Sequence, residues 1–178
     1  WDTSTINWLN SGNPDQYYNL DAVTFDDTSA AGAVTLSSTM YPGSIFVTNN
    51  AQSYTLGGAG ALTGTGTLTK SGPGTLTIGT ANSSFTGNIL INGGTLALAS
   101  GASIGGGSMT IGSGATLSLP LSGTSVSLNR TLSVPAGQTG IITSGVTSSL
   151  ISGALSSGDA LSTLILSPSS KLSFSGTN

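Results

Sequence analysis

A short strand pattern that recurs along the chain constrains its fold more than any other feature. Residues 66–78 read GTLTKSGPGTLTI, and shorter copies follow at 94–98 (GTLAL) and 115–119 (ATLSL). Each copy joins a small or turn-forming residue to a strand whose apolar side chains alternate with Thr, Ser or Ala. One such strand cannot bury its own apolar face, so the copies must stack around a shared core. The pattern predicts an all-β solenoid, specifically a parallel β-helix.

The spacing of the copies predicts the size of the solenoid. Equivalent strands lie at 88–91 and 108–111, and again at 94–98 and 115–119, which gives about 20 residues per coil. Roughly eight coils at ~4.8 Å each would form a rod about 40 Å long, with right-handed crossovers. The run 144–158 alternates poorly and is expected to be a protruding loop or irregular last coils. Alternation assigns these residues to the core: Leu68, Leu76, Ile78, Ile89, Ile91, Leu96, Leu98, Met109, Ile111, Leu117, Leu119, Leu132 and Val134.

Composition argues against several classes of function. Charged residues make up 5% of the chain, against roughly 25% in ordinary domains, so Ser, Thr, Asn and Gly must cover a surface typical of extracellular β-proteins. The absence of His and Cys removes disulfides, thiolate metal sites and the commonest general base. Three basic residues cannot neutralise a nucleic-acid backbone. No apolar run reaches the ~18–20 residues that span a membrane.

These exclusions predict a non-enzymatic domain with no cofactor, no metal site, no nucleic-acid partner and no membrane partner. The chain starts at Trp1 without a signal peptide, and we interpret it as a part excised from a larger secreted protein. We expect a single β-helix domain over 1–178. Within it, residues 1–50 would form a cap and the first coils, and residues 51–178 the repeat coils.

Most aromatic residues lie in the first 50 positions, where two roles compete for them. An open solenoid end must be capped because it exposes strand edges and core. Flat aromatic rings with polar neighbours also bind sugars by stacking and hydrogen bonding. We assign Trp1 and Phe25 to the cap and leave Trp8 open between the two roles.

The candidate carbohydrate-binding residues combine aromatic and polar side chains. Neighbouring Tyr17 and Tyr18 point to opposite faces of an extended chain, so at least one should be accessible. Phe46 should face away from the core, because its two neighbours in the strand 44–48 face inward. The full candidate set is Trp8, Asp15, Gln16, Tyr17, Tyr18, Tyr41 and Phe46.

The charged residues leave alternatives open. Asp15, Asp21, Asp26 and Asp27 could supply a glycosidase acid/base pair or a Ca²⁺ site, although Asp at such positions most often serves turns and strand ends. The basic residues Lys70 and Arg130 could abstract a proton in a lyase, but structural placement is the favoured interpretation.

Residues 62–98 resemble the autotransporter-associated β-strand repeat. The shared features are Thr67-Leu-Thr-Lys70, Gly72, Gly74-Thr-Leu-Thr-Ile78, Phe85-Thr-Gly87 and Asn92-Gly-Gly-Thr-Leu96. This resemblance implies a right-handed β-helix in the passenger region of a secreted or surface-displayed bacterial protein. In its size and aromatic cap, the chain is also similar to the β-helical carbohydrate-binding module of a gut-bacterial xylanase, which implies xylan binding without catalysis.

Three functions follow as expectations. The first is a non-catalytic carbohydrate-binding module that holds an appended glycoside hydrolase against xylan-type plant cell-wall polysaccharide. The second is a structural stalk or adhesin segment of an autotransporter-type surface protein. The third, a β-helical lyase or hydrolase, is disfavoured by the missing histidine and the sparse charge.

Overall fold

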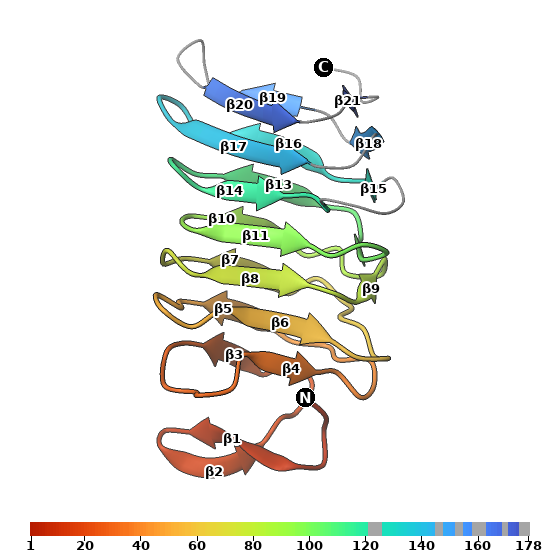
Figure 1. Ribbon diagram of the computed structural model, residues 1–178. Helices are drawn as coiled ribbons and strands as arrows, with labels where there is room; N and C mark the ends of the chain where they lie inside the picture. The colour runs from red at the N-terminus through yellow and green to blue at the C-terminus, as the bar shows by residue number, and fades with distance from the viewer. Residues whose placement is uncertain (121–125, 145–147, 152–154, 158–162, 169–170, 175–178) are drawn as a thin grey trace.

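The chain folds into a solenoid of stacked parallel strands. The computed structural model describes residues 1–120, 126–144, 148–151, 155–157, 163–168 and 171–174, and within these ranges it has strands and turns but no helix. Figure 1 shows the coils stacked one above another from the N-terminal to the C-terminal end. The predicted all-β class and the parallel solenoid architecture are confirmed.

Two principal sheets run the length of the solenoid, each with seven parallel strands among the described residues. The described residues therefore form seven levels, where the sequence led us to expect roughly eight coils. The first sheet contains β3 (Ala22–Phe25), β5 (Ser44–Val47), β7 (Thr67–Lys70), β10 (Ile89–Ile91), β13 (Ser108–Ile111), β16 (Thr131–Val134) and β19 (Leu155–Ser157). The second contains β4 (Ala33–Thr35), β6 (Tyr54–Gly57), β8 (Thr75–Ile78), β11 (Thr95–Leu98), β14 (Thr116–Ser118), β17 (Thr139–Ser144) and β20 (Thr163–Pro168).

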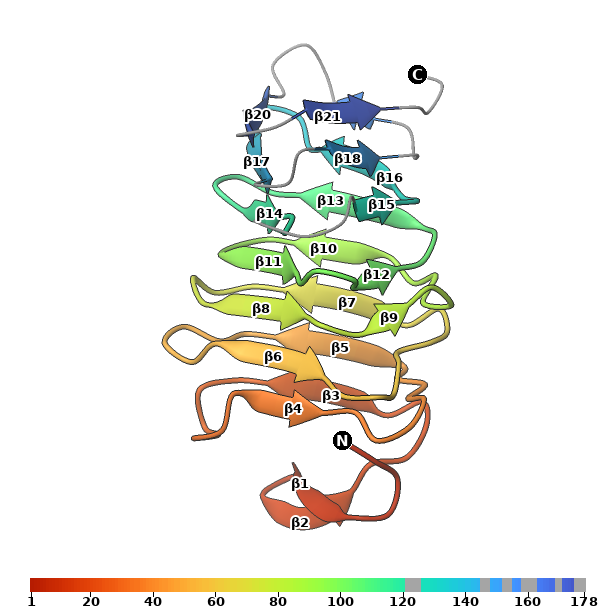
Figure 2. The same ribbon diagram turned by 45° about the vertical axis from the view of Figure 1, so that its right-hand side comes forward.

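A third side of the solenoid carries shorter strands, which Figure 2 brings forward. Strands β9 (Ala81–Asn82) and β12 (Ser103–Ile104) pair with each other. Above them, β15 (Val126–Leu128), β18 (Ser148–Ile151) and β21 (Lys171–Phe174) form a three-stranded parallel sheet. Strands β18 and β19 fall inside the run 144–158, so the described residues of that run belong to coils, which was one of its two expected alternatives.

The core follows from the register of the coils. Leu76, Leu96 and Leu117 stack on one another in the second sheet, and Leu68, Ile89 and Met109 stack in the first. All thirteen residues that alternation assigned to the core are buried, while Thr and Ser between them face outward. Each coil thus completes the core of its neighbours, as the repetition predicts.

Tight corners between strands need residues without a side chain. At Gly94, φ is +63°, and a Cβ there would lie 2.4 Å from the carbonyl oxygens of both Gly72 and Gly74. No other residue fits between the stacked corners. Gly94 therefore marks the corner between β10 and β11.

Two buried cations donate hydrogen bonds to backbone carbonyls at different places along the solenoid. The Lys70 Nζ donates to the carbonyl oxygens of Ser71 at 2.7 Å and Gly72 at 2.9 Å. The Arg130 guanidinium donates to the carbonyls of Phe85 at 2.8 Å, Gly87 at 2.8 Å and Ser108 at 3.2 Å. Both side chains are fully enclosed, which bears out the structural interpretation of these two residues.

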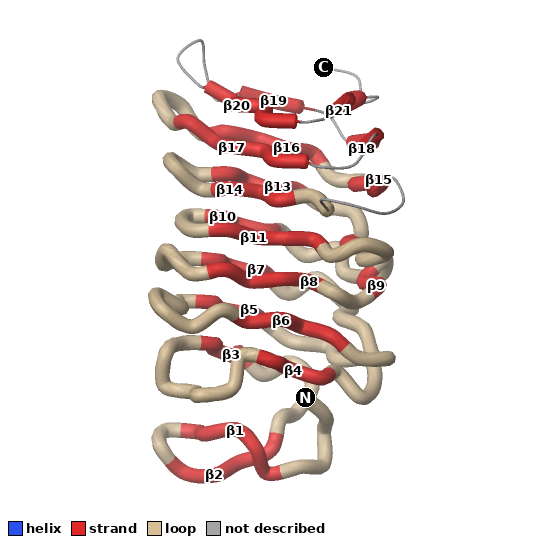
Figure 3. Tube along the Cα trace, in the orientation of Figure 1, coloured by secondary structure: helices blue, strands red, loops and turns tan. Residues whose placement is uncertain are grey.

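The N-terminal end is closed by an antiparallel hairpin of β1 (Ile6–Asn10) and β2 (Asn13–Gln16). Ser11 and Gly12 form its two-residue turn, and both have positive φ, at 51° and 83°, as a type I′ turn requires. Figure 3 shows this hairpin below the first coil, separate from both long sheets.

Candidate functional site in the N-terminal cap

Four aromatic side chains join the hairpin to the first coil. The ring centroid of Trp1 lies 5.3 Å from Trp8, 5.2 Å from Tyr17 and 5.7 Å from Phe25, each pair in edge-to-face geometry. Such contacts add to the area that the rings bury. Trp1 and Phe25 are buried, and Trp8 is partly buried against them. The cap assignment of Trp1 and Phe25 is confirmed, and Trp8 belongs to the same cluster.

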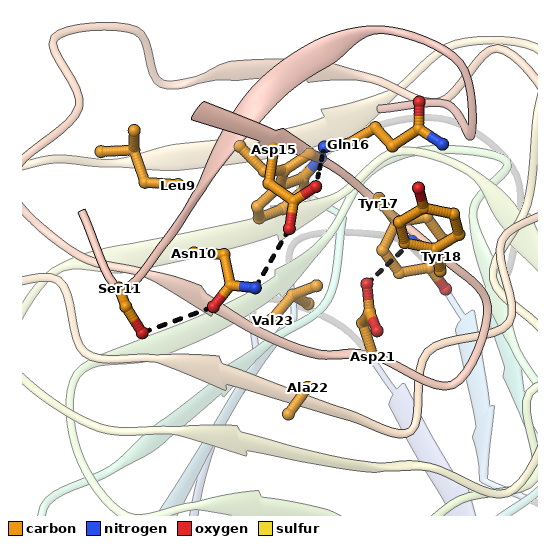
Figure 4. Close-up of a pocket in the computed structure, with 11 residues that line it drawn as sticks. Leu9, Asn10, Ser11, Asp15, Gln16, Tyr17, Tyr18, Asp21, Ala22 and Val23 are labelled. Atoms are coloured by element: carbon orange, nitrogen blue, oxygen red, sulfur yellow. Dashed lines mark hydrogen bonds between the residues drawn. The ribbon is translucent and has the colours of Figure 1, made fainter. Parts of the chain in front are cut away.

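A shallow cleft of about 380 Å³ lies beside this cluster. Strands β1 and β2 form one wall, and the start of β3 with the segment before it forms the other. Five of the seven candidate binding residues line it: Trp8, Asp15, Gln16, Tyr17 and Tyr18. Figure 4 shows the Asp15 carboxylate between the Asn10 amide and the Gln16 backbone, at 3.1 Å and 2.8 Å.

The two neighbouring tyrosines have opposite environments. Tyr17 is 1% exposed and Tyr18 is 54% exposed, as the alternation of the chain predicts for one of them. Burial raises the pKa of Tyr17 to about 12. Its hydroxyl faces the Tyr41 backbone but makes no hydrogen bond within the described residues. The Tyr17 ring is thus a packing element, and Tyr18 is the tyrosine with an open ring face.

The other two candidates lie outside the cleft. Tyr41 is 40% exposed and covers Gly64, where a Cβ would come within 2.8 Å of the ring. Phe46 is 42% exposed and faces outward, as predicted, from the first sheet between Thr24 and Thr69. The candidate set therefore divides into five residues that line the cleft and two aromatic residues elsewhere on the surface.

The carboxylates of Asp21, Asp26 and Asp27 accept hydrogen bonds from backbone N–H groups. Asp27 accepts hydrogen bonds from the N–H groups of residues 50–52 at 2.9–3.4 Å, and these bonds lower its pKa. The Thr28 hydroxyl and N–H likewise lower the pKa of Asp26. Asp21 accepts from the Tyr18 N–H at 2.8 Å. The Asp26 and Asp21 contacts match the expected turn chemistry, whereas Asp27 bonds to a segment one coil further along the chain. The described residues contain no cluster of carboxylates suited to a metal ion.

A second and larger cleft, of about 850 Å³, was not anticipated from the sequence. It lies between the hairpin and the first coil, and its walls include Trp8, Leu9, Phe25 and Tyr54 together with residues of β3 and β4. The only sequence signal for it is the need to close an open solenoid end, because such an end leaves strand edges without partners.

A protein-family model matches part of the chain by sequence. The passenger-associated-transport-repeat family matches residues 68–98, from β7 to β11, within the stretch that resembles the autotransporter-associated repeat. No curated protein and no solved structure matches the chain. The matched repeat is structural rather than catalytic, which agrees with the prediction of a non-enzymatic domain.

The match also bears on location and on the competing functions. A passenger repeat implies a bacterial protein that is secreted or held at the cell surface. It supports the structural passenger segment, while the narrower resemblance to a xylan-binding module receives no support from it. In the described ranges, no helix has the length and apolar character that crossing a membrane demands.

Proposed function

We propose that this chain is a structural segment of a bacterial passenger region, a rigid β-helical stalk that holds other parts of a surface protein away from the cell. The observation that carries this proposal is the unbroken parallel register of the two seven-stranded sheets. Each coil is fixed by the ladder and core of its neighbours, so the described coils form a continuous support. The family match to residues 68–98 points the same way.

Surface display with one coil removed tests the stalk. The chain is placed between an outer-membrane anchor and a dye-labelled tag ahead of Trp1, and the dye's energy transfer to a membrane probe is measured. Deleting residues 74–93 joins Pro73 to Gly94 and removes one coil in register. If the solenoid is a stalk, this deletion should bring the tag closer to the membrane by about 5 Å. An unchanged transfer efficiency, or a tag already at the membrane in the full chain, would contradict the proposal.

Carbohydrate binding remains a second candidate, because five of the seven candidate residues, exposed Tyr18 among them, line the small cleft. Aromatic stacking at Tyr18, hydrogen bonds that the Asp15 carboxylate accepts from sugar hydroxyls, and hydrogen bonds with the Gln16 amide would hold a xylan-type chain. The protein would then be tethered to a glycoside hydrolase in its parent polypeptide.

Affinity gel electrophoresis against xylan, β-glucan, mannan and pectin tests this second candidate. Retardation by xylan that Tyr18→Ala abolishes and Tyr41→Ala preserves would support it. The matched control is apt because Tyr41 is similarly exposed but lies outside the cleft. If no polysaccharide retards the protein, carbohydrate binding is excluded and only the stalk proposal stands.

A further inference from the structure

The first coil keeps a free edge on the side that faces the hairpin. In the part of the chain that the structure describes, β3 pairs only with β5 and β4 pairs only with β6. The hairpin strands β1 and β2 pair only with each other. An unpaired edge of this kind is a template for a further strand. The larger cleft lies directly against the β3 and β4 edges.

Trp1 has already begun a new ladder on this edge. Its nitrogen donates to the Thr35 carbonyl, and its carbonyl oxygen accepts from the Ser37 N–H at 3.2 Å. A residue that bonds to the two neighbours of one opposite residue in this way is in parallel register with that residue, here Leu36. Trp1 therefore lies one coil below Leu36, on the side opposite to the Gly57 carbonyl that accepts from the Leu36 N–H.

Alternation identifies which backbone groups remain open. Thr35 and Ser37 direct groups toward Trp1, whereas Leu36 donates upward to the Gly57 carbonyl at 2.7 Å. Because successive residues of a strand direct their hydrogen-bonding groups to opposite sides, the Ala33 N–H and C=O and the Thr35 N–H face the cleft.

We propose that the β4 edge, together with Trp1, is an acceptor site for one further parallel strand that is covalently joined to the Trp1 nitrogen. The strand must be joined to this nitrogen because Trp1 already occupies the ladder position opposite Leu36. A separate peptide in the same register would place its carboxyl end against the Trp1 nitrogen. This inference stands apart from the stalk function, since the edge accepts a strand whatever the coils support.

The register also specifies the side chains of that strand. The residue two positions before Trp1 pairs with Val34, a half-buried side chain packed on the core, so an apolar residue is required there. The residues on either side of it pair with Ala33 and Thr35 and face outward. The sequence Gly-Thr-Leu-Thr, as found at residues 74–77, meets these requirements, with Leu beneath Val34.

An extended chain tests the site. Gly-Thr-Leu-Thr is added directly before Trp1, and hydrogen exchange of the Ala33 and Thr35 amides is followed by NMR. Pairing predicts that the added Leu accepts from Thr35 and that the added Gly accepts from Ala33. Exchange at both amides should slow at least 10-fold, while the Leu36 amide, already bonded, serves as an internal reference.

A matched control separates pairing from simple coverage. An added Gly-Thr-Pro-Thr lacks the N–H that would donate to the Ala33 carbonyl, so it should leave both amides exchanging as in the unextended chain. Circular dichroism verifies that both extended chains are folded. Unchanged exchange with the Leu extension, or equal protection by both extensions, would overturn the proposal.

Discussion

At the residue scale, the buried cations show how a chain with few charges uses them. Arg130 is enclosed and donates to three carbonyls contributed by two preceding levels of the solenoid. Its guanidinium also lies over the Phe85 ring, 5.7 Å from the centroid. Sequence analysis could favour a structural role for this residue, but it could not identify its partners, because they lie more than 20 residues away.

Replacing this cation should loosen the stack. Arg130→Met leaves the Phe85, Gly87 and Ser108 carbonyls without their donor, and we expect a loss of about 1–3 kcal/mol in the free energy of unfolding. Urea denaturation measures the change, with Arg130→Lys expected to recover only part of it. If Arg130→Met were as stable as the parent, desolvation of the cation would outweigh its hydrogen bonds.

Tyr17 offers the opposite case, a buried polar atom whose removal should do no harm. Its hydroxyl is buried without a hydrogen bond among the described residues, so Tyr17→Phe should be neutral or stabilising by up to about 1 kcal/mol. Because burial raises the pKa of Tyr17 from 10.0 to about 12, the unfolded chain loses this proton at a lower pH than the folded protein does. Stability should therefore fall between about pH 10 and pH 12.

Thermal melts across this pH range measure the effect. Tyr17→Phe should reduce the alkaline decline, and the part that remains includes Tyr54, whose pKa burial also raises. An equal decline in Tyr17→Phe and in the parent would place the titrating group elsewhere.

At the element scale, a strand could be predicted where apolar and polar residues alternate along it for several positions. Strands β8 and β11 were predictable because inward Leu or Ile alternates with outward Thr or Ala over four residues. The hairpin was not, because Ile6 and Leu9 are both largely exposed and its strands share no core face with the coils. Strand β9 is only two residues long, too short for periodicity. Alternation could place Tyr17 and Tyr18 on opposite faces, but it could not tell which one the cap covers.

The hairpin turn provides a test at this scale. Gly12 has φ of +83° with open space around its Cβ position, so Gly12→Ala should cost about 1–2 kcal/mol through backbone strain alone. Gly57, in β6, also has open space but no positive φ, and Gly57→Ala should be neutral or stabilising. Chemical denaturation compares the two variants, and equal effects would rule out strain at the turn.

At the scale of the whole molecule, the solenoid behaves as a one-dimensional array. Duplicating residues 74–93 repeats one coil with its register intact, since Gly74 and Gly94 begin equivalent strands. We expect a folded protein at least as stable as the parent and about 4.8 Å longer. The chain has no cysteine, so spin labels can be attached at Thr3→Cys and Ser113→Cys, on either side of the duplicated coil. Pulsed electron paramagnetic resonance then measures the distance between the two labels. An unfolded product, or an unchanged distance, would contradict the array.

The parallel register of the coils has a consequence for how samples of this protein are judged. Strands stacked about 4.8 Å apart along one axis have the repeat that fibre diffraction assigns to cross-β amyloid. An oriented film of the native, fully folded protein should therefore give the amyloid reflection by itself. For this molecule, that reflection cannot distinguish a misfolded deposit from the functional state.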